Sequence, residues 1–389
     1  MRECGMTLTR IAAAALIAAL AAGCSNARLV PLEEWEVEQM QLSFDRQARV
    51  ETVGLPLLAA AAPRCGRDAV PITGAVFINY LAFAPMDRRA AQKILGDDDR
   101  LQVLRTGLAD ASGLMKGDIL VRVGDDPAPR GETATREWVE LSDRLARTQQ
   151  MFDITVLRAG QEITLRLEPV PVCPYRIAVW EIENIFGRTT GAEINVSSGL
   201  LRFTRTDQEL AVVLAHEIAH NISGHARLLR IGDLAGPVSI AMFDMVAAMI
   251  GSDARGALSK TSDPGTPQPR ADAHPIELEL EADYVGLYLM AAAGMNVEGA
   301  EQVWRRLATA LPENAADPAY LENPTHPTHT ARFMAFREWI PEIKAKQAQG
   351  LPLEPEKLDW RRWMETHDGI GAAPVAAGDA SEEPAPPAP

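Results

Sequence analysis

The sequence predicts an α+β protein, in which a mainly helical domain with a small β-sheet follows a smaller β/α domain. Two observations predict this class. Between residues 72 and 170, short runs of alternating apolar and polar residues surround one helical segment, 133–147. From residue 206 onward, the chain is dominated by segments with helical spacing of apolar residues. The 389 residues are enough for two domains with their own cores and for additional tails.

The N-terminal residues predict a cleaved secretory segment and a lipid anchor. Residues 1–23 combine two arginines with an Ala-rich apolar run that is too short to span a bilayer. The run ends in LAAGC, which resembles a bacterial lipobox. We therefore expect lipidation of Cys24, whose acyl chains would anchor the protein in the cell envelope facing the periplasm, with the outer membrane favoured over the inner one. Ordinary cleavage, giving a soluble periplasmic protein, is the alternative.

Residues 24–71 are predicted to form a helical lead-in, and residues 72–170 the β/α domain. The strand-like runs of this domain are 76–83, 101–104, 118–123, 152–157 and 162–167. Its segment LADASGLMKGDILVRVGDDPAP, followed by FDITVLRAGQEITLRLEP, resembles a bacterial PDZ domain. The resemblance implies capture of extended chain ends by addition of a strand to a sheet edge. A small α+β domain without a peptide groove is the alternative.

The segment TDQELAVVLAHEIAHNISGH contains an HExxH motif formed by His216, Glu217 and His220. Thr206 and Glu209 form a capping box before an apolar run, so we expect the motif to lie on a helix. Histidines four residues apart on a helix lie one turn above each other and can bind one zinc ion. The neighbouring Glu217 can reach a water at that metal.

A third ligand is predicted downstream, in the segment IELELEADYVGLYLM. Zinc held by two histidines commonly takes a carboxylate as its third ligand and keeps one position open. Glu279 and Asp283 are four residues apart and share a helix face, so we expect Glu279 to bind the metal and Asp283 to hold the outer nitrogen of a ligand histidine. Glu281 should point elsewhere. His225 lies about 180° round the helix from the first motif histidine, and we reject it as a ligand.

Several sequence blocks together resemble the gluzincin metallopeptidase family that includes the CAAX prenyl endopeptidases, HtpX and BepA. The blocks, which lie between residues 173 and 343, are Asn184, EINVSSGLL, DQELAVVLAHEIAHNISGH, ELEAD and THPTHTAR. The resemblance implies a zinc-dependent endopeptidase that acts on misfolded or specially marked proteins, with His326 near the metal. In zinc peptidases of this shape an edge strand pairs with the extended substrate, and we expect residues 193–198 to be that strand.

The predicted reaction is hydrolysis of peptide bonds in protein or peptide substrates, with one Zn²⁺ per chain. Glu217 would act as general base, and His326 would stabilise the oxyanion or occupy the open zinc position, with Arg332 assisting. One alternative is a PDZ-containing chaperone or scaffold with a silent zinc site, which the intact Glu217 disfavours. Another is a zinc aminopeptidase with a cleft closed at one end. The sequence makes no prediction of oligomeric state.

The net charge and the cysteines allow two further predictions, one about partners and one about a disulfide. The net charge of −15 argues against a nucleic-acid partner. An oxidising compartment favours a disulfide between Cys65 and Cys173, with two buried free thiols as the alternative.

The zinc metallopeptidase domain is expected to cover residues 173–347. Residues 348–389 form a C-terminal segment that ends in a disordered tail rich in Ala and Pro.

Overall fold

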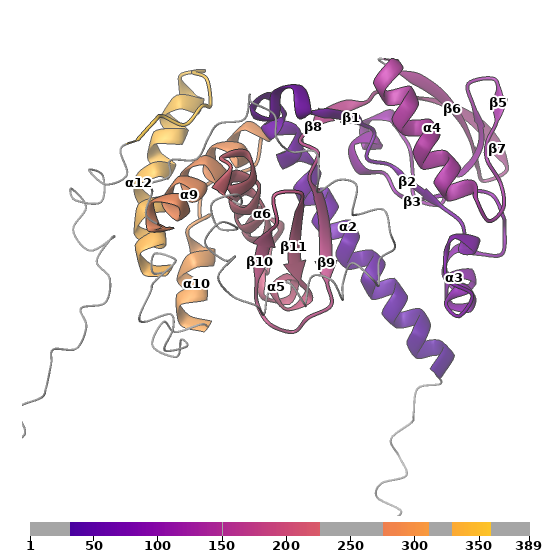
Figure 1. Cartoon of the computed structure of the whole chain (residues 1–389), viewed down its shortest axis with the longest axis horizontal. Helices are drawn as coiled ribbons and strands as arrows, with labels where there is room; N and C mark the ends of the chain where they lie inside the picture. The colour runs from indigo at the N-terminus through magenta and orange to yellow at the C-terminus, as the bar shows by residue number, and fades with distance from the viewer. Residues whose placement is uncertain (1–31, 150, 226–274, 311–328, 359–389) are drawn as a thin grey trace, which may run out of the picture.

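The computed structural model describes residues 32–149, 151–225, 275–310 and 329–358, which form a mixed helix-and-sheet fold (Figure 1). The helices are α2 (Leu32–Cys65), α3 (Arg88–Leu95), α4 (Ala134–Thr148), α5 (Ser198–Phe203), α6 (Asp207–Ile222), α9 (Pro275–Ala292), α10 (Gln302–Ala310) and α12 (His329–Ala348), with short 3₁₀ turns η1 (Gly66–Asp68), η2 (Tyr80–Ala82) and η3 (Gly107–Ser112). The strands are β1 (Val70–Ile72), β2 (Val76–Ile78), β3 (Gln102–Arg105), β4 (Ile119–Val123), β5 (Asp126–Pro127), β6 (Phe152–Arg158), β7 (Gln161–Leu167), β8 (Val170–Val172), β9 (Arg176–Trp180), β10 (Gly187–Thr189) and β11 (Glu193–Ser197). The predicted combination of helices with small sheets is confirmed at this level.

Several predicted features lie outside the described residues. They are the secretory segment, Cys24, His326 and the Ala/Pro-rich tail. Within the described part of the chain, none of the helices is both long enough and apolar enough to span a bilayer.

The β/α domain is built on an antiparallel sheet in the order β2–β3–β4–β6–β7, with β5 paired to β4. Helix α4 packs Trp138 against Phe77 of the sheet, with ring centroids 4.7 Å apart. Strand β2 ends at Ile78, so the predicted strand 76–83 is too long. The reason is Asn79, whose buried amide donates hydrogen bonds to two backbone carbonyls of neighbouring loops and whose oxygen caps turn η2.

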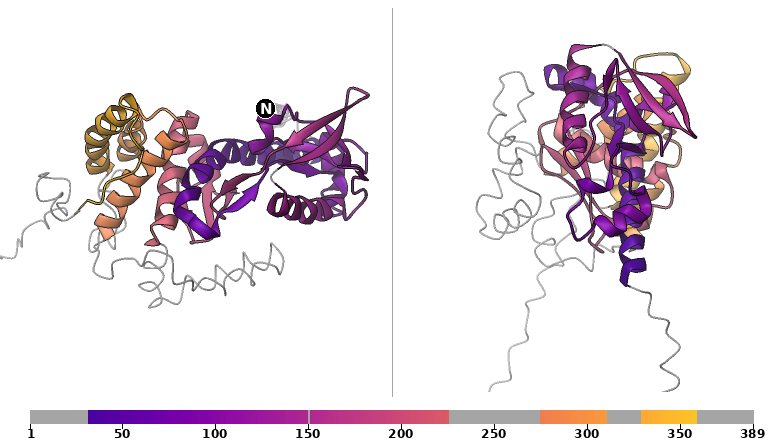
Figure 2. Two further views of the ribbon diagram at one scale, coloured as in Figure 1. Left: turned by 90° about the horizontal axis from the view of Figure 1, so that it is seen from above. Right: turned by 90° about the vertical axis from the view of Figure 1, so that its right-hand side faces the viewer.

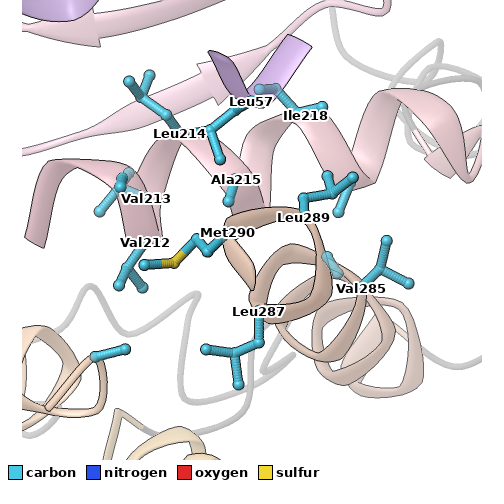
Figure 3. Packing of buried hydrophobic residues seen from close by; sticks show 14 of the residues in the cluster. Leu57, Val212, Val213, Leu214, Ala215, Ile218, Val285, Leu287, Leu289 and Met290 are labelled. Carbon is cyan, nitrogen blue, oxygen red and sulfur yellow. The ribbon is translucent and has the colours of Figure 1, made fainter. Parts of the chain in front are cut away.

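Helix α2 runs between the β/α domain and the helical part of an elongated molecule (Figures 1 and 2). On one side, Leu57 joins the buried cluster that contains Leu214 and Ile218 of α6 (Figure 3). On the other side, Glu51 accepts two hydrogen bonds of 2.5 and 3.0 Å from Arg105 of the β/α domain. The predicted helical lead-in is therefore a central element, because its apolar face completes the core on which α6 rests.

The β/α domain is joined to the rest of the molecule by a short two-stranded stem. Strands β1 and β8 pair antiparallel where the chain enters and leaves the domain, with Val70 opposite Val172. Just outside this pair, Cys65 and Cys173 form a disulfide with Cα atoms 5.7 Å apart. The entry and the exit of the domain are thus held together both by hydrogen bonds and covalently.

A second sheet lies beside α6, in the order β10–β11–β9. Strand β11 runs parallel to β9 and antiparallel to β10, so it is the middle strand. The prediction that residues 193–198 form the edge strand is therefore wrong, and within the described residues β10 is the edge strand packed along α6. The strand-like pattern of β11 reveals that a strand exists, but it does not reveal which neighbours pair with it.

Helices α6 and α9 cross closely in the core (Figure 3). A Cβ atom at Gly286 of α9 would lie 3.1 Å from the backbone carbon of Ala215 and from the backbone nitrogen of His216. A Cβ atom here would make an unusually tight contact with backbone atoms, so the glycine favours the close approach of the two backbones at the first histidine of the HExxH motif. The crossing brings the acidic residues of α9 opposite the histidines of α6.

Candidate active site

Helix α6 begins with the predicted cap. The Thr206 hydroxyl accepts a hydrogen bond of 3.2 Å from the backbone N–H of Glu209, whose carboxylate accepts one of 2.7 Å from the backbone N–H of Arg205. Every residue of the helix from 210 to 222 is buried. A helix that is largely apolar on all sides belongs in a core, so the two histidines and the glutamate of the motif are held inside the protein.

His216, His220 and Glu279 bring their donor atoms together at the crossing of α6 and α9. The Nε2 atoms of the two histidines are 3.0 Å apart, and the carboxylate oxygens of Glu279 lie 3.3 Å from His216 Nε2 and 3.2 Å from His220 Nε2. A tetrahedral zinc with bonds of about 2.0–2.1 Å to nitrogen and oxygen separates its ligand atoms by about 3.3–3.4 Å. Both the spacing and the donor types therefore fit a zinc ion, and three protein ligands leave one position for water or substrate.

Burial and neighbouring charges shift the pKa values of the two histidines in opposite directions. Burial and the charge of Arg332 act to lower the pKa of His216, but hydrogen bonds to Asp283 and Glu279 outweigh them and raise it to about 9. Burial lowers the pKa of His220 to about 4, although Glu279 opposes this shift. Metal binding requires both histidines in the neutral form, so zinc would compete with protons for these nitrogens.

Asp283 lies behind His216, at the position expected for a residue that orients it. Its Oδ1 atom is 3.0 Å from His216 Nδ1, which leaves Nε2 to face Glu279. Asp283 is in turn held by Arg332, which donates hydrogen bonds of 2.7 and 2.6 Å to its two carboxylate oxygens. Burial alone would raise the pKa of Asp283, but Arg332 and His216 hold it below the ordinary value. The carboxylate therefore remains charged.

Arg332 reaches this position from α12 and is itself buried. Its guanidinium carbon lies 3.4 Å from the centre of the Trp304 ring of α10. Its Nη2 atom is also 3.0 Å from His216 Nδ1, and one of its nitrogens is 3.8 Å from Glu279. Of the THPTHTAR block, the structure places Arg332 against the metal-site cluster. His326 of the same block lies outside the described residues.

Glu217 is buried beside the edge strand β10. A Cβ atom at Gly187 would lie 3.2 Å from Glu217 Oε1 and 3.0 Å from a methyl group of Val213. The backbone of β10 therefore passes directly against the carboxylate predicted to act as the base. The sequence pattern does not single out Gly187, because a lone glycine between short runs does not show what its backbone approaches.

The prediction that His225 is not a ligand agrees with the structure, but helical geometry did not indicate its contact with His220. His225 does not belong to the three-residue cluster, yet it is buried next to His220. Continued helical turns do not apply at residue 225, because α6 ends at Ile222 and Gly224 has a left-handed φ of 76°. Glu281, also expected to point away from the site, lies 3.8 Å from His225 through its Oε2 atom.

The region that contains this geometry matches known metallopeptidases. Residues 183–340 match the model of Peptidase family M48. This family is zinc-dependent, and the match supports a metalloprotease in agreement with the His-His-Glu cluster. The expected resemblance to a metallopeptidase family is thereby confirmed for this part of the chain as a match to family M48. The matched range begins after the β/α domain, whose PDZ-like character remains a prediction.

Three curated relatives align with this region. Mitochondrial metalloendopeptidase OMA1 of Schizosaccharomyces pombe is 32% identical over 158 residues, which cover 40% of this chain and 44% of the relative. OMA1 of Saccharomyces cerevisiae is 26% identical over 155 residues, 39% of this chain and 42% of the relative. A Vibrio cholerae protein, provisionally named a beta-barrel assembly-enhancing protease, is 30% identical over 173 residues, 44% of this chain and 34% of the relative. The chain therefore spans less than half the length of the relatives that it matches.

Proposed function

We propose that this protein is a zinc-dependent endopeptidase of the bacterial cell envelope that cleaves misfolded or marked proteins. The observation that carries the proposal is the His216–His220–Glu279 cluster with Glu217 one residue from its first ligand. The M48 match and the metalloendopeptidase names of two relatives support the same reaction class. The name of the bacterial relative and the lipobox-like LAAGC support the cell envelope.

In the proposed mechanism, each residue of the site has a separate task. His216, His220 and Glu279 would hold zinc, which supplies Lewis-acid activation of a water molecule and of the scissile carbonyl. Glu217 accepts the proton of the attacking water and delivers it to the leaving amine. Asp283 fixes the orientation of His216 by accepting a hydrogen bond from its Nδ1–H group. His326 retains its proposed role at the oxyanion or at the open zinc position, with Arg332 assisting from beside His216.

The edge of β10 that has no paired strand among the described residues is the surface that would align an extended substrate. The carbonyl of Phe186 and the N–H of Thr190 bond to β11. Since backbone groups alternate sides along a strand, those of Gly187 and Thr189 face away from β11. A substrate paired with this edge would place its backbone next to Glu217, because Gly187 has no side chain to separate them. This arrangement favours an endopeptidase over an aminopeptidase, since an open edge accepts a chain that continues in both directions.

Chelation of zinc is expected to abolish cleavage of an unfolded protein and of an internally quenched peptide with both ends blocked. Purified protein should contain about one zinc per chain by elemental analysis, and activity should return when zinc is added back. Cleavage of the doubly blocked peptide distinguishes an endopeptidase from an aminopeptidase, which needs a free amino end. Zinc binding without cleavage of either substrate would favour the alternative of a chaperone with a silent site.

A Cys24→Ser variant is expected to lose its membrane attachment or to accumulate as an unprocessed precursor. The acyl chains on Cys24 would supply the anchor, and a serine cannot carry the same lipid. Fractionation of cells that express the wild-type protein and the variant, together with mass spectrometry of the N-terminal peptide, measures this. Wild-type protein found in the soluble periplasmic fraction would contradict the lipobox assignment.

The β/α domain is proposed to be a PDZ-like module that presents captured chain ends to the protease. What supports this role is the sequence resemblance, together with an edge strand, β2, packed near helix α4. The stem and the Cys65–Cys173 bond would keep such a captured end at a set distance from the metal site.

Removal of the Cys65–Cys173 bond is expected to slow the cleavage of long unfolded proteins more than that of short peptides. The bond spans a sequence separation of 108 residues, and closing such a loop is worth about 4–5 kcal/mol in the chain-entropy model. The measurement compares rates on both substrate types for the double Ala variant and for the wild type with and without reductant, below the unfolding temperature of each. Equal slowing on the two substrates would contradict the positioning role.

A further inference from the structure

His225 lies directly behind His220, on the side away from the metal-site cluster. It is 2% exposed, and its Nδ1 atom is 3.0 Å from Nδ1 of His220. The two rings are tilted by 74° with centroids 5.1 Å apart, so the contact is made by nitrogen atoms rather than by stacked faces. His225 follows the end of α6, where Gly224 has a left-handed φ of 76°, and its ring lies against His220 of that helix.

The positions of the ring nitrogens determine how the protons are arranged. Nε2 of His220 faces His216 at 3.0 Å and Glu279 at 3.2 Å, so this nitrogen is the one offered to a metal. A neutral imidazole that binds a metal through Nε2 carries its proton on Nδ1. His220 therefore donates a hydrogen bond from Nδ1, and Nδ1 of His225 accepts it.

The same reasoning shows which ring nitrogen of His225 carries its proton. If Nδ1 of His225 is an acceptor, its proton must be on Nε2. That Nε2 atom faces Oε2 of Glu281, at 3.8 Å, and the carboxylate favours a proton on this nitrogen. Glu281 is on α9, two residues after Glu279. The helix that contributes Glu279 to the metal-site cluster therefore also contacts His225.

We propose that His225 is a positioning residue that fixes the tautomer and ring orientation of His220 by accepting the hydrogen bond from its Nδ1. Asp283 contacts His216 in the corresponding way, so each cluster histidine has its own acceptor behind it. The two acceptors come from different elements, Asp283 from α9 and His225 from the turn after α6. The proposal rests on the proposed zinc site and goes beyond it, since His225 is not one of the metal ligands.

The test is the affinity of the full-length protein for zinc, measured by competition with a chromophoric chelator. Loss of such an outer acceptor typically weakens metal binding about 10–100-fold. We expect this loss in His225→Ala and in His225→Leu, which fills the space without an acceptor. His225→Asn should bind zinc within a few-fold of the wild type, because its amide oxygen can take the place of Nδ1.

The three variants show whether His225 acts as a hydrogen-bond acceptor or only by filling space. If His225→Leu binds zinc as tightly as the wild type while His225→Asn does not, the residue acts by filling space and the proposal is overturned. Equal zinc affinity of all three variants and the wild type overturns it as well. Circular dichroism identifies the variants that fold, and should His225→Ala fail to do so, the comparison of the Asn and Leu variants decides the question.

His216→Ala identifies which of the two proposals fails. This variant should lose zinc binding altogether, because it removes a ligand. If it retains wild-type affinity, the proposed zinc site itself is wrong, and the positioning role of His225 is overturned with it. If it loses zinc while the His225 variants do not, the zinc site stands and the inference about His225 is overturned alone.

Discussion

Replacement of Glu217 by glutamine is expected to reduce peptide hydrolysis by about 10²–10⁴-fold while zinc remains bound. The amide keeps the size of the side chain and its place beside Gly187 and Val213, but it cannot accept a proton from water. The metal-site donors are on other residues, His216, His220 and Glu279, so the substitution leaves the cluster intact. The loss should therefore appear in kcat rather than in zinc content.

The measurement is the steady-state rate on a quenched peptide, together with elemental analysis of the same protein sample. Asp207→Asn provides a matched control, because Asp207 is on the same helix but its side chain is 65% exposed and paired with Arg49. The control should retain its rate. Loss of zinc together with activity in Glu217→Gln would assign Glu217 to the ligands, and full activity would remove it from the mechanism.

The metal-site cluster could be predicted from sequence because local helix geometry places the residues of each helix, and zinc chemistry indicates that the two sets belong together. Spacings of four residues place His216 above His220 and Glu279 above Asp283, and the Thr206 cap gives the first helix its start. What brings the two helices together is the close approach at Gly286, which no spacing rule contains. The pairing of carboxylates with histidines was inferred from zinc chemistry rather than from the packing of the helices.

The predictions that needed tertiary information were the ones that differed from the structure. The contact of His225 depends on where α6 ends, since the helix stops at Ile222 and Gly224 has a left-handed φ of 76°. The edge strand depends on pairing, and β10 is only three residues long with no alternating pattern. Helix α2 is helical as predicted, but its mixture of charged and apolar residues does not reveal that it contacts both the core around α6 and Arg105 of the β/α domain.

Arg332→Met is expected to destabilise the protein by about 3–5 kcal/mol, because it leaves the Asp283 carboxylate buried without its main counter-charge. Asp283 is 1% exposed and Arg332 is 4% exposed, and two hydrogen bonds of 2.7 and 2.6 Å join them. The variant also gives up the contact of the guanidinium with the Trp304 ring. In Asp283→Asn combined with Arg332→Met, no charge of this pair remains, so the double variant should be more stable than Arg332→Met alone.

Urea unfolding of zinc-loaded protein measures these differences, and Arg166→Met is the matched control. Arg166 forms the same kind of two-bond pair with Asp153, at 2.8 and 3.2 Å, but these side chains are 66% and 42% exposed. Breaking this exposed pair should change the free energy of unfolding little, since water solvates both groups. If Arg332→Met is no more destabilising than Arg166→Met, the buried pair behind His216 does not hold the site together, and the orientation of His216 must depend on the packing of α6 against α9 alone.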